Sequence, residues 1–490
     1  MSEQITGLSP QLLWKHFFEL SQIPRSSKEE KNACKHIMQI AKRRGLAYKS
    51  DNAGNLVIKK PGVESYENKP TIVLQGHIDM VCEKNRDVSH DFSNDPIILK
   101  RDGDWIMADG TTLGADNGIG VAVAMAIMES DELIHGPLEF LFTVEEETGL
   151  IGAMELSTNM LDGKILLNLD SDEEGVIYNG CAGGKNAELF LQIKSEDVPA
   201  GLKPVFVKLT GLSGGHSGTN IHEGRGNTIK LINRFLHSAL PNVDGRLADI
   251  EGGNKHNAIP REAYAKVFLP EYSTEKFMEL AMEFDKMLKD EYSIIDNKVN
   301  IAIERTGFEV PDKVFTTEFQ KELISVLYAI PHGVITRSNT TPGEVETSNN
   351  LAIINCGKDF VTILTCQRSV TKSQLEDIYE TVAACGEVVG AEVKGCSSYS
   401  PWQPNPESSL MKRAKKVYKD SFGNEPEVKT IHAGVESGII GDKYPGMDMI
   451  SFGVNISGAH SPDEKVQISS VEKFWKFTTE LIKDYTSLSG

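Results

Sequence analysis

The sequence predicts a layered α/β domain that is interrupted by an inserted domain of α+β type. In the first 185 residues, runs such as TIVLQ and KILLNL are apolar on both faces and alternate with helical segments, as strands buried between layers of helices do. From about residue 186 half-buried strand patterns take over, and after a Ser/Pro-rich stretch at 397–407 the α/β pattern returns. We therefore predict one domain of residues 1–185 and 397–490, with residues 186–396 inserted into it.

The order of elements follows from the spacing of apolar residues. A first helix over 8–23 is stopped by Pro24, and Ser26 or Ser27 is expected to cap a second helix that reaches Arg44. The rest of the two-part domain is expected to form strands at 56–60, 71–75, 138–144, 164–169 and 447–453 and helices at 117–130, 408–422 and 471–487. The insertion is expected to form strands at 187–193, 204–212 and 263–269 and helices at 228–239 and 273–290, followed by a similar block at 319–329, 350–354, 359–366 and 373–385.

Composition excludes several classes of protein. The 490 residues include 70 Asp and Glu against 51 Lys and Arg, a formal net charge of −19 that repels nucleic acid and anionic membranes. The seven cysteines are dispersed without a Cys-x-x-Cys pair, which favours a reducing compartment. The chain begins without a signal-peptide pattern, and its longest apolar run, near 121–128, is far shorter than the roughly 18 residues of a membrane span. We expect a soluble, cytoplasmic protein that binds neither nucleic acid nor membrane.

Histidine and acidic residues stand where the buried strands end. The carboxyl ends of parallel strands form the ligand crevice of an open α/β sheet, so side chains from separate strands can converge there. Imidazole and carboxylate ligands suit zinc, cobalt or manganese, and with at least five of them one carboxylate would bridge if two ions are bound. These candidates are His77 and Asp79 after TIVLQG, Asp116 in a Gly-rich turn, Glu145, Glu146 and Glu147 after LEFLFTV, Asp170 at the end of KILLNLD, and His460 in SGAHSPDE.

Two local patterns strengthen the expectation of a metal. In His77-x-Asp79, a carboxylate two residues from a ligating histidine can accept its other ring N–H and so fix its tautomer. Three consecutive glutamates at the end of a hydrophobic strand repel one another, and a cation is the natural compensation. Any one of these residues alone would most simply be a solvated loop charge, but five at successive strand ends are not explained that way. Asp109 and Asp172 neighbour the candidates and could be mistaken for them.

A competing motif lies in the insertion. Gly211-Leu212-Ser213-Gly214-Gly215 fits the G-x-S-x-G nucleophile elbow, but an elbow opens directly into a helix, and the HSGTNIHEGRGN that follows is poor in helix formers. His216, on this flexible turn, is the better candidate for a residue that reaches into a cleft, although an exposed loop histidine is the simpler explanation. Among the other histidines, His16, His36 and His237 fall in helical segments and are expected at the surface, and His256 and His432 lie in Gly-containing loops.

The motifs GHIDMV, TTLGADNGIG, TVEEETG, LNLDSDEEG and AHSPDE, in this order and spacing, resemble those of the co-catalytic dizinc metallopeptidases that include aminoacylase and carnosinase. Six further segments are similar to the subgroup of bacterial aminoacyl-histidine dipeptidases, also called cytosolic non-specific dipeptidases. They are GCAGG (180–184), GLSGGHSG (211–218), GGNKHNAIP (252–260), VETSNNLA (345–352), TCQRS (365–369) and IHAGVESG (431–438).

The resemblance implies a role for each candidate residue. One Zn²⁺ would be held by His77 and Asp170 and a second by Glu147 and His460, with Asp116 bridging; Co²⁺ or Mn²⁺ could replace zinc. Glu146 corresponds to the general base and Asp79 to the carboxylate that orients His77. The substrate-binding positions correspond to His216 for the oxyanion, Asn257 and Arg368 for the substrate backbone or carboxylate, and Gly434 for a backbone contact. The extra acidic residues in SDEEG leave Asp172 as a rival ligand to Asp170.

The function implied is metal-dependent hydrolysis of dipeptides, Xaa-His and others, with the insertion acting as a lid. Three alternatives stay open: deacylation of N-acyl amino acids, a non-catalytic binding protein on the same scaffold, and a serine esterase that uses Ser213. The family includes dimers, so the resemblance also allows a homodimer.

Overall fold

The computed structural model describes residues 3–339, 341 and 343–487. The chain forms two compact units: unit 1 comprises Met1–Gly180, Trp402–Thr430 and Val435–Gly490, and unit 2 comprises Cys181–Pro401 and Ile431–Gly434. Unit 2 therefore includes 181–185, 397–401 and 431–434, which the sequence analysis assigned to the two-part domain. The reason is strand pairing, because β9 (Gly183–Gln192) and β19 (Glu392–Tyr399) belong to the sheet of unit 2, and Ala182 donates a hydrogen bond to the carbonyl of Ile431.

Unit 1 is built on an eight-stranded sheet of order β1-β2-β6-β3-β7-β21-β8-β20. The central strands β6, β3, β7 and β21 run parallel to one another. The pairs β1–β2, β2–β6 and β21–β8 are antiparallel. β3 is buried along its whole length, as the apolar run on both faces predicts. The strands are β1 (Ala47–Ser50), β2 (Leu56–Lys60), β3 (Ile72–His77), β6 (Leu138–Thr143), β7 (Ile165–Ser171), β8 (Val176–Cys181), β20 (Glu427–Ile431) and β21 (Asp448–Gly453).

Helices cover this sheet and bury its side chains. The larger core of unit 1 lies between the sheet and five helices: α1 (Gln11–Ser21), α2 (Lys31–Arg43), α3 (Ala115–Glu129), α9 (Ser409–Phe422) and α11 (Ile468–Thr486). Two shorter helices, α4 (Ile151–Glu155) and α10 (Glu436–Lys443), pack against each other. A separate small sheet has the order β22-β23-β5-β4, formed by Ile456–Ser457, Lys465–Gln467, Trp105–Ala108 and Leu99–Asp102.

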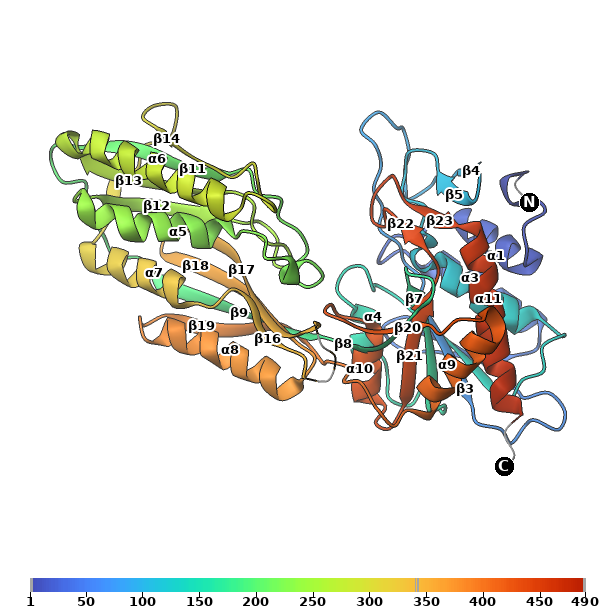
Figure 1. Cartoon of the computed structure of the whole chain (residues 1–490). Helices are drawn as coiled ribbons and strands as arrows, with labels where there is room; N and C mark the ends of the chain where they lie inside the picture. Colours follow the sequence, from blue (N-terminus) through green and yellow to red (C-terminus); the bar gives the residue numbers. More distant parts are fainter. Residues whose placement is uncertain (1–2, 340, 342, 488–490) are drawn as a thin grey trace. The chain divides into compact units, whose positions relative to one another are not determined.

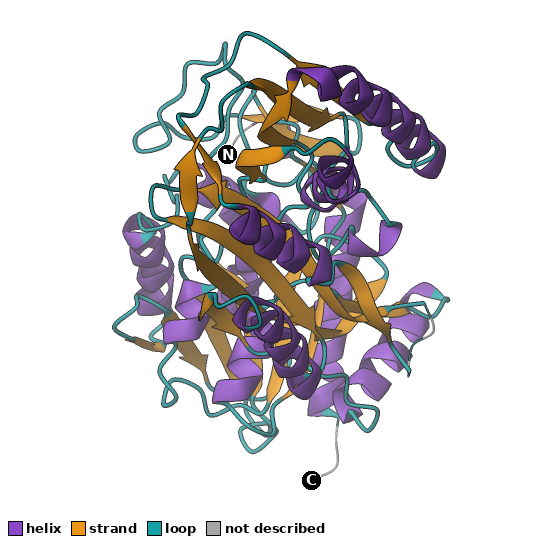
Figure 2. Ribbon diagram, turned by 90° about the vertical axis from the view of Figure 1, so that its left-hand side faces the viewer, coloured by secondary structure: helices purple, strands orange, loops and turns teal. Residues whose placement is uncertain are grey.

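Unit 2 is a nine-stranded antiparallel sheet covered on one face by four helices (Figure 1; helices are purple and strands orange in Figure 2). Its main path is β14-β11-β13-β12-β17-β18-β9-β19, with β16 paired to β17. Besides β9 and β19, the strands are β11 (Leu202–Thr210), β12 (Arg246–Gly252), β13 (Ala263–Pro270), β14 (Asn300–Glu304), β16 (Gly333–Arg337), β17 (Val345–Cys356) and β18 (Phe360–Ser369). The helices are α5 (Thr228–Ala239), α6 (Thr274–Glu291), α7 (Thr317–Ala329) and α8 (Lys372–Glu387). Two short strands, β10 (Ser195–Asp197) and β15 (Lys313–Phe315), form a two-stranded sheet of their own.

The layered α/β architecture with a second α+β unit confirms the predicted fold class. One local prediction is wrong. Neither Ser26 nor Ser27 caps the second helix, which begins at Lys31 after Glu30. The Ser27 hydroxyl instead donates to Asp79 Oδ2 at 2.7 Å, a tertiary contact that spacing along the chain does not reveal.

Candidate functional site

Three neighbouring parallel strands of unit 1 end in candidate ligands. In the register of the sheet, His77 at the end of β3 is opposite Thr143 at the end of β6, and Gln75 is opposite Asn168 of β7. Asp170 near the end of β7 and the turn Glu145–Glu147 after β6 therefore lie at one edge of the sheet. β3 pairs with β6 on one side and with β7 on the other. Open α/β sheets bind ligands in a crevice at the carboxyl ends of such neighbouring strands, which is where these residues lie.

Asp116 lies between the two candidate histidines. Its Oδ1 is 3.1 Å from His77 Nε2, and its Oδ2 is 3.2 Å from His460 Nε2. Asp170 Oδ1 is 3.3 Å from His77 Nε2, and Glu147 Oε2 is 3.1 Å from His460 Nε2. One carboxylate thus faces both imidazoles, and the Nε2 atom of each imidazole lies close to one further carboxylate.

These residues form three groups whose ligand atoms lie within 4.8 Å of one another: His77 with Asp116 and Asp170, Asp116 with Glu147 and His460, and His77 with Glu146 and Glu147. The first two groups share Asp116, as a pair of adjacent ions bridged by a carboxylate requires. Asp172 and Asp109 belong to none of the groups found among the described residues. Asp109 instead accepts an ion pair from Lys100 at 2.5 Å, and the Asp172 carbonyl accepts a hydrogen bond from the backbone of Ile456.

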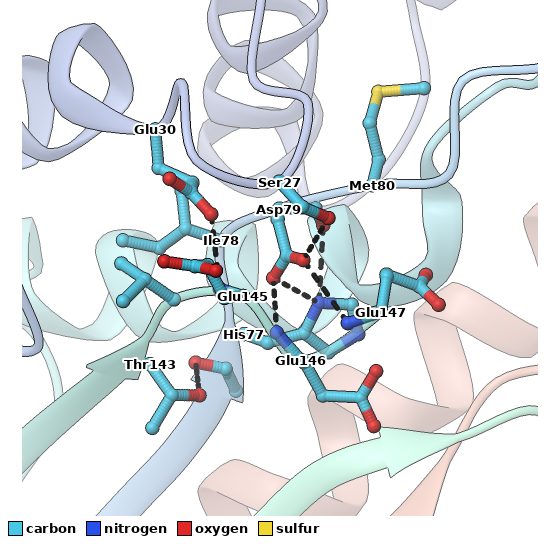
Figure 3. Close-up of polar contacts among 12 residues, drawn as sticks. Ser27, Glu30, His77, Ile78, Asp79, Met80, Thr143, Glu145, Glu146 and Glu147 are labelled. Carbon is cyan, nitrogen blue, oxygen red and sulfur yellow. Dashed lines mark hydrogen bonds and ion pairs between the residues drawn. The ribbon is translucent and has the colours of Figure 1, made fainter. Parts of the chain in front are cut away.

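Asp79 supports both His77 and the glutamate turn (Figure 3). Its Oδ1 is 3.3 Å from His77 Nδ1, which leaves Nε2 to face the cluster. The same carboxylate accepts hydrogen bonds from the backbone N–H groups of Glu146 and Glu147, at 3.0 and 3.1 Å. Although burial opposes ionisation, the hydrogen bond with His77 lowers the pKa of Asp79 to about 2. Asp79 is therefore an ionised carboxylate that fixes two parts of the cluster.

Glu146 and Glu147 are adjacent in sequence but differ in their contacts. Glu147 is paired with His460, whereas Glu146 is grouped with His77 and Glu147 only. Burial raises the pKa of Glu146 well above its usual range against the attraction of His77, and the carboxylates of Asp170 and Glu436 add to the rise. A carboxyl group that is not a bridging ligand and has a raised pKa suits proton transfer near neutral pH.

The donor set fits divalent cations. Glu147 Oε1 and Asp170 Oδ1 are buried and have no hydrogen-bond partner among the described residues, although each carboxylate lies close to an imidazole. Burial raises the pKa of Asp170 to about 7, and hydrogen bonds with Asp116 and Glu147 raise the pKa of His460 to about 11. Both pKa shifts reflect carboxylates that lie close together, an arrangement that a positive charge stabilises. Two imidazoles and three carboxylates, without thiolates, are ligands of the kind that zinc, cobalt and manganese accept.

Three charged residues that the sequence analysis missed hold the cluster in place. Glu464, which is buried, accepts hydrogen bonds from the backbone N–H groups of four successive residues, 113–116, at 2.7 to 3.3 Å. Arg25, also buried, donates to the carbonyls of Ile78 and Gly114 at 2.6 and 2.5 Å. Glu30 accepts the N–H of Glu145 at 3.0 Å (Figure 3). The only signal in the sequence is that Glu464 lies four residues after His460 in SPDE.

A further buried carboxylate, Glu436, begins α10 beneath the cluster. It accepts hydrogen bonds from Gln75 at 2.5 Å and from the Thr143 hydroxyl at 2.7 Å. Burial raises the pKa of Glu436 to about 7. Gln75 also accepts from Asn168, so a polar chain crosses β6, β3 and β7 one layer below the ligands.

In unit 2, the backbone fixes the tautomer of His216. Its Nδ1 accepts hydrogen bonds from the N–H groups of Gly218 and Thr219, both at 3.1 Å, so the proton of the neutral ring is on Nε2. Burial and the positive charge of Arg368 lower the pKa of His216 to about 4. At neutral pH His216 is therefore a neutral hydrogen-bond donor through Nε2.

Arg368 and Gly434 lie on either side of one tyrosine. Arg368 Nη1 donates to Tyr399 Oη at 2.6 Å, and a methyl group added at Gly434 would meet the Tyr399 ring at 2.6 Å, so only glycine fits there. Arg368 is buried, yet its Nε has no hydrogen-bond partner among the described residues. Asn257 is half-buried next to the bridge between His216 and Ala258, and its carbonyl accepts from Ser217.

Ser213 does not lie on a nucleophile elbow. β11 ends at Thr210, and the first helical turn after it is a short 3-10 helix, Ile221–Glu223. The exposed Ser213 donates its backbone N–H to Asp296 at 2.7 Å. The sharp strand-to-helix turn that an elbow requires is absent from this described segment.

Comparison with known proteins shows the family of the chain. The model of "Peptidase family M20/M25/M40" matches residues 73–484. The chain belongs to this peptidase family. It is 40% identical over 484 residues to the cytosol non-specific dipeptidase of Escherichia coli, covering 99% of each chain. The crystal structure of aminoacylhistidine dipeptidase from Vibrio alginolyticus is 41% identical, with a TM-score of 0.88 over 99% of this chain and 98% of that one.

A solved structure of low sequence identity shares the fold. Aminopeptidase PepT from Bacillus cereus is 16% identical with a TM-score of 0.57, over 98% of this chain and 99% of that one. In the part of the present chain that the structure describes, no helix is long and apolar enough to cross a membrane.

Proposed function

We propose that the protein is a cytoplasmic dipeptidase that uses two divalent metal ions, zinc by preference, to hydrolyse the peptide bond of Xaa-His and other dipeptides. The observation that carries this proposal is Asp116, whose two carboxylate oxygens face His77 and His460 at 3.1 and 3.2 Å, with Asp170 and Glu147 completing the two sets. The dipeptidase names of the Escherichia coli and Vibrio alginolyticus relatives, each near 40% identical over the full length, support the substrate class.

The residues present would hold the ions as two adjoining sets: His77 and Asp170 on one side, Glu147 and His460 on the other, and Asp116 between them. The unpartnered oxygens of Glu147 and Asp170 support this assignment, because a buried carboxylate oxygen without a hydrogen bond is costly unless a cation satisfies it. When bound, zinc would supply Lewis-acid chemistry, polarising the scissile carbonyl and lowering the pKa of a water molecule.

The protein's own groups then move the proton. Glu146 takes a proton from the attacking water and delivers it to the leaving amine, a role that a carboxyl with a raised pKa serves better than an ordinary one. The raised pKa of Glu146, caused by burial, supports this role. Asp79 keeps His77 in one tautomer and holds the Glu146–Glu147 backbone, so that neither side chain must reorganise during the reaction.

Unit 2 would supply the substrate-binding groups. His216, with its proton on Nε2, is suited to donate to the oxyanion, and Arg368 to bind the dipeptide carboxylate. Asn257 and the backbone at Gly434 are proposed to contact the substrate main chain.

A substrate panel tests the proposal. Xaa-His and other dipeptides, N-acetyl amino acids and a tripeptide are incubated with the protein as purified, after chelation, and after restoring zinc. We expect cleavage of dipeptides that is lost with the chelator and regained with zinc. Cleavage of acylated amino acids alone would replace the dipeptidase with a deacylase, and no cleavage despite bound zinc would favour a binding protein. Cleavage that the chelator leaves untouched would reject the metal mechanism.

A further inference from the structure

A second cluster of metal-ligand side chains lies in unit 1, outside the site described above. It is formed by His16 and Glu19 of α1 and His36 of α2. His16 Nδ1 is 3.1 Å from Glu19 Oε2, and His36 Nε2 is 3.4 Å from the same oxygen. Ligand atoms on a tetrahedral zinc ion, each about 2.1 Å from the metal, are about 3.4 Å apart, so these separations suit a shared ion.

His16 is the unusual member of this cluster. The sequence analysis expected His16 at the surface, but its side chain is 0% exposed. Its Nε2 lies 3.0 Å from Glu129 Oε2 at the end of α3, yet neither atom forms a hydrogen bond with any described residue. Asp170 Oδ1 in the first cluster shows the same combination, 3.3 Å from His77 Nε2 and without a hydrogen bond.

We propose that His16, Glu19 and His36 form a third metal site, for Zn²⁺ or a similar borderline divalent ion, with Glu129 as the carboxylate behind His16. His16 would bind through Nδ1 and present Nε2 to Glu129, the arrangement in which a carboxylate fixes a ligating imidazole. Glu19 and His36 are 30% and 22% exposed, so an ion can enter from solvent and keep water as its remaining ligand. Three protein ligands with an open position are within the range of zinc coordination.

The surroundings of the site favour a structural role. The three ligands come from α1 and α2, and Glu129 comes from α3, so a bound ion would connect three of the helices that cover the sheet of unit 1. Lys15 and Arg43 each lie 3.8 Å from one of the carboxylates, at Glu19 Oε1 and Glu129 Oε1, and leave the Oε2 atoms to the imidazoles. Glu146 and its neighbours are not part of this cluster, which makes its occupancy separable from activity.

Metal content and anomalous diffraction test the proposal. The purified chain is stripped with a chelator, titrated with Zn²⁺, freed of excess ion and analysed for zinc per chain. We expect His36→Ala and Glu19→Gln each to bind one zinc fewer than the unaltered chain, and both substitutions are at partly exposed positions that should not prevent folding. The matched control is His237→Ala, an exposed histidine on α5 whose neighbour is the Tyr328 ring.

The position of the ion is tested independently of its number. In crystals of the unaltered chain soaked in Zn²⁺, we expect an anomalous peak at the zinc edge between α1 and α2. The absence of this peak, or equal zinc content in the unaltered chain and His36→Ala, would overturn the proposal and leave only direct contacts between the imidazoles and the carboxylates. Failure of the proposed two-metal site would instead remove the peaks at Asp116 and leave the one at His16, and failure of the dipeptidase activity alone would leave all of these peaks in place.

Discussion

At the scale of single residues, two adjacent glutamates have different surroundings. Glu147 faces His460 at 3.1 Å, whereas Glu146 has His77 and Glu147 as its neighbours in the cluster. Neighbouring positions in a turn project their side chains in different directions, so one can serve as a ligand while the other stays available for proton transfer. The two roles can be separated by experiment, because metal binding and turnover are measured independently.

We predict that Glu146→Ala keeps its metal but loses turnover by a factor on the order of 10²–10⁴, the usual contribution of general acid–base catalysis. Glu147→Ala should instead lose metal, because His460 would keep only Asp116 as a partner. Zinc content and kcat on a dipeptide distinguish the two variants, with Glu145→Ala as the control from the same turn. Loss of metal from Glu146→Ala would mean that the two roles are reversed.

The neutral state of His216 gives a prediction about pH. Its pKa is lowered to about 4 by burial and Arg368, so between an ordinary histidine value near 6.5 and about 4 the unfolded chain binds a proton that the folded chain does not. The contribution of His216 to stability is therefore complete above this range and falls as the pH falls through it. We expect the His216 resonance in labelled protein, assigned by its absence from His216→Gln, to show a neutral ring at pH 5. A charged ring at pH 5 would contradict the acceptor role of Nδ1 toward Gly218 and Thr219, because both nitrogens of a charged imidazole carry protons.

At the scale of elements, Glu464 joins two loops of the site. It accepts four backbone N–H groups of the segment 113–116 that carries Asp116, and it lies in the same loop as His460. A change at Glu464 should therefore disturb both ligands, although it touches neither side chain.

We predict that Glu464→Gln weakens metal binding about 10- to 100-fold, as loss of an outer support of a metal ligand commonly does. The amide nitrogen of Gln would face backbone N–H groups that need an acceptor. Titration of the metal-free variant with zinc measures the effect, and Glu472→Gln on the exposed face of α11 is the control. Unchanged affinity would show that Asp116 is held by other contacts.

Elements with a strong local pattern could be predicted from the sequence. The strand at 56–60 and the helix at 228–239 have the predicted bounds, because apolar spacing and, for the helix, the capping side chain of Asn227 act within a few residues. The start of α2 could not be predicted, because Ser27 is engaged by Asp79, 52 residues away. Half-exposed strands such as β16 and β20 were also missed, since they have no apolar run and depend on their partner strands.

The candidate ligands could be named from the sequence because each follows a recognisable buried strand or a Gly-rich turn. The residues that hold these ligands in place could not be predicted from the sequence. Arg25 and Glu464 act on backbone groups 53 to 351 residues away along the chain, and although Glu464 ends the AHSPDE motif, nothing in that motif indicates which backbone groups it binds. The burial of His16 was missed for a similar reason, since its carboxylate partner Glu129 is on another helix.

At the scale of the whole molecule, all proposed metal ligands belong to unit 1. We predict that chelation lowers the stability of this unit and leaves unit 2 unchanged. Ions at 1,000 times their dissociation constant stabilise the folded state by about 4 kcal/mol each, so the effect is large. Calorimetry with and without chelator measures this effect. The unfolding transition of unit 1 should move to lower temperature without zinc, and the transition of unit 2 should keep its temperature. A uniform shift of one transition would mean that the units unfold together.

The position of β21 in the sheet has a consequence for biosynthesis. This strand lies between β7 and β8, in the interior of the eight-stranded sheet, but it comes from residues 448–453, near the end of the chain. Until β21 is synthesised, β7 lacks this partner strand and the sheet of the first 180 residues is incomplete. The main segment of unit 2 has by then been synthesised in full. We therefore expect nascent unit 2 to become protease-resistant before unit 1, and the group of Asp116, Glu147 and His460 to bind zinc only after the segment that carries His460 has been synthesised.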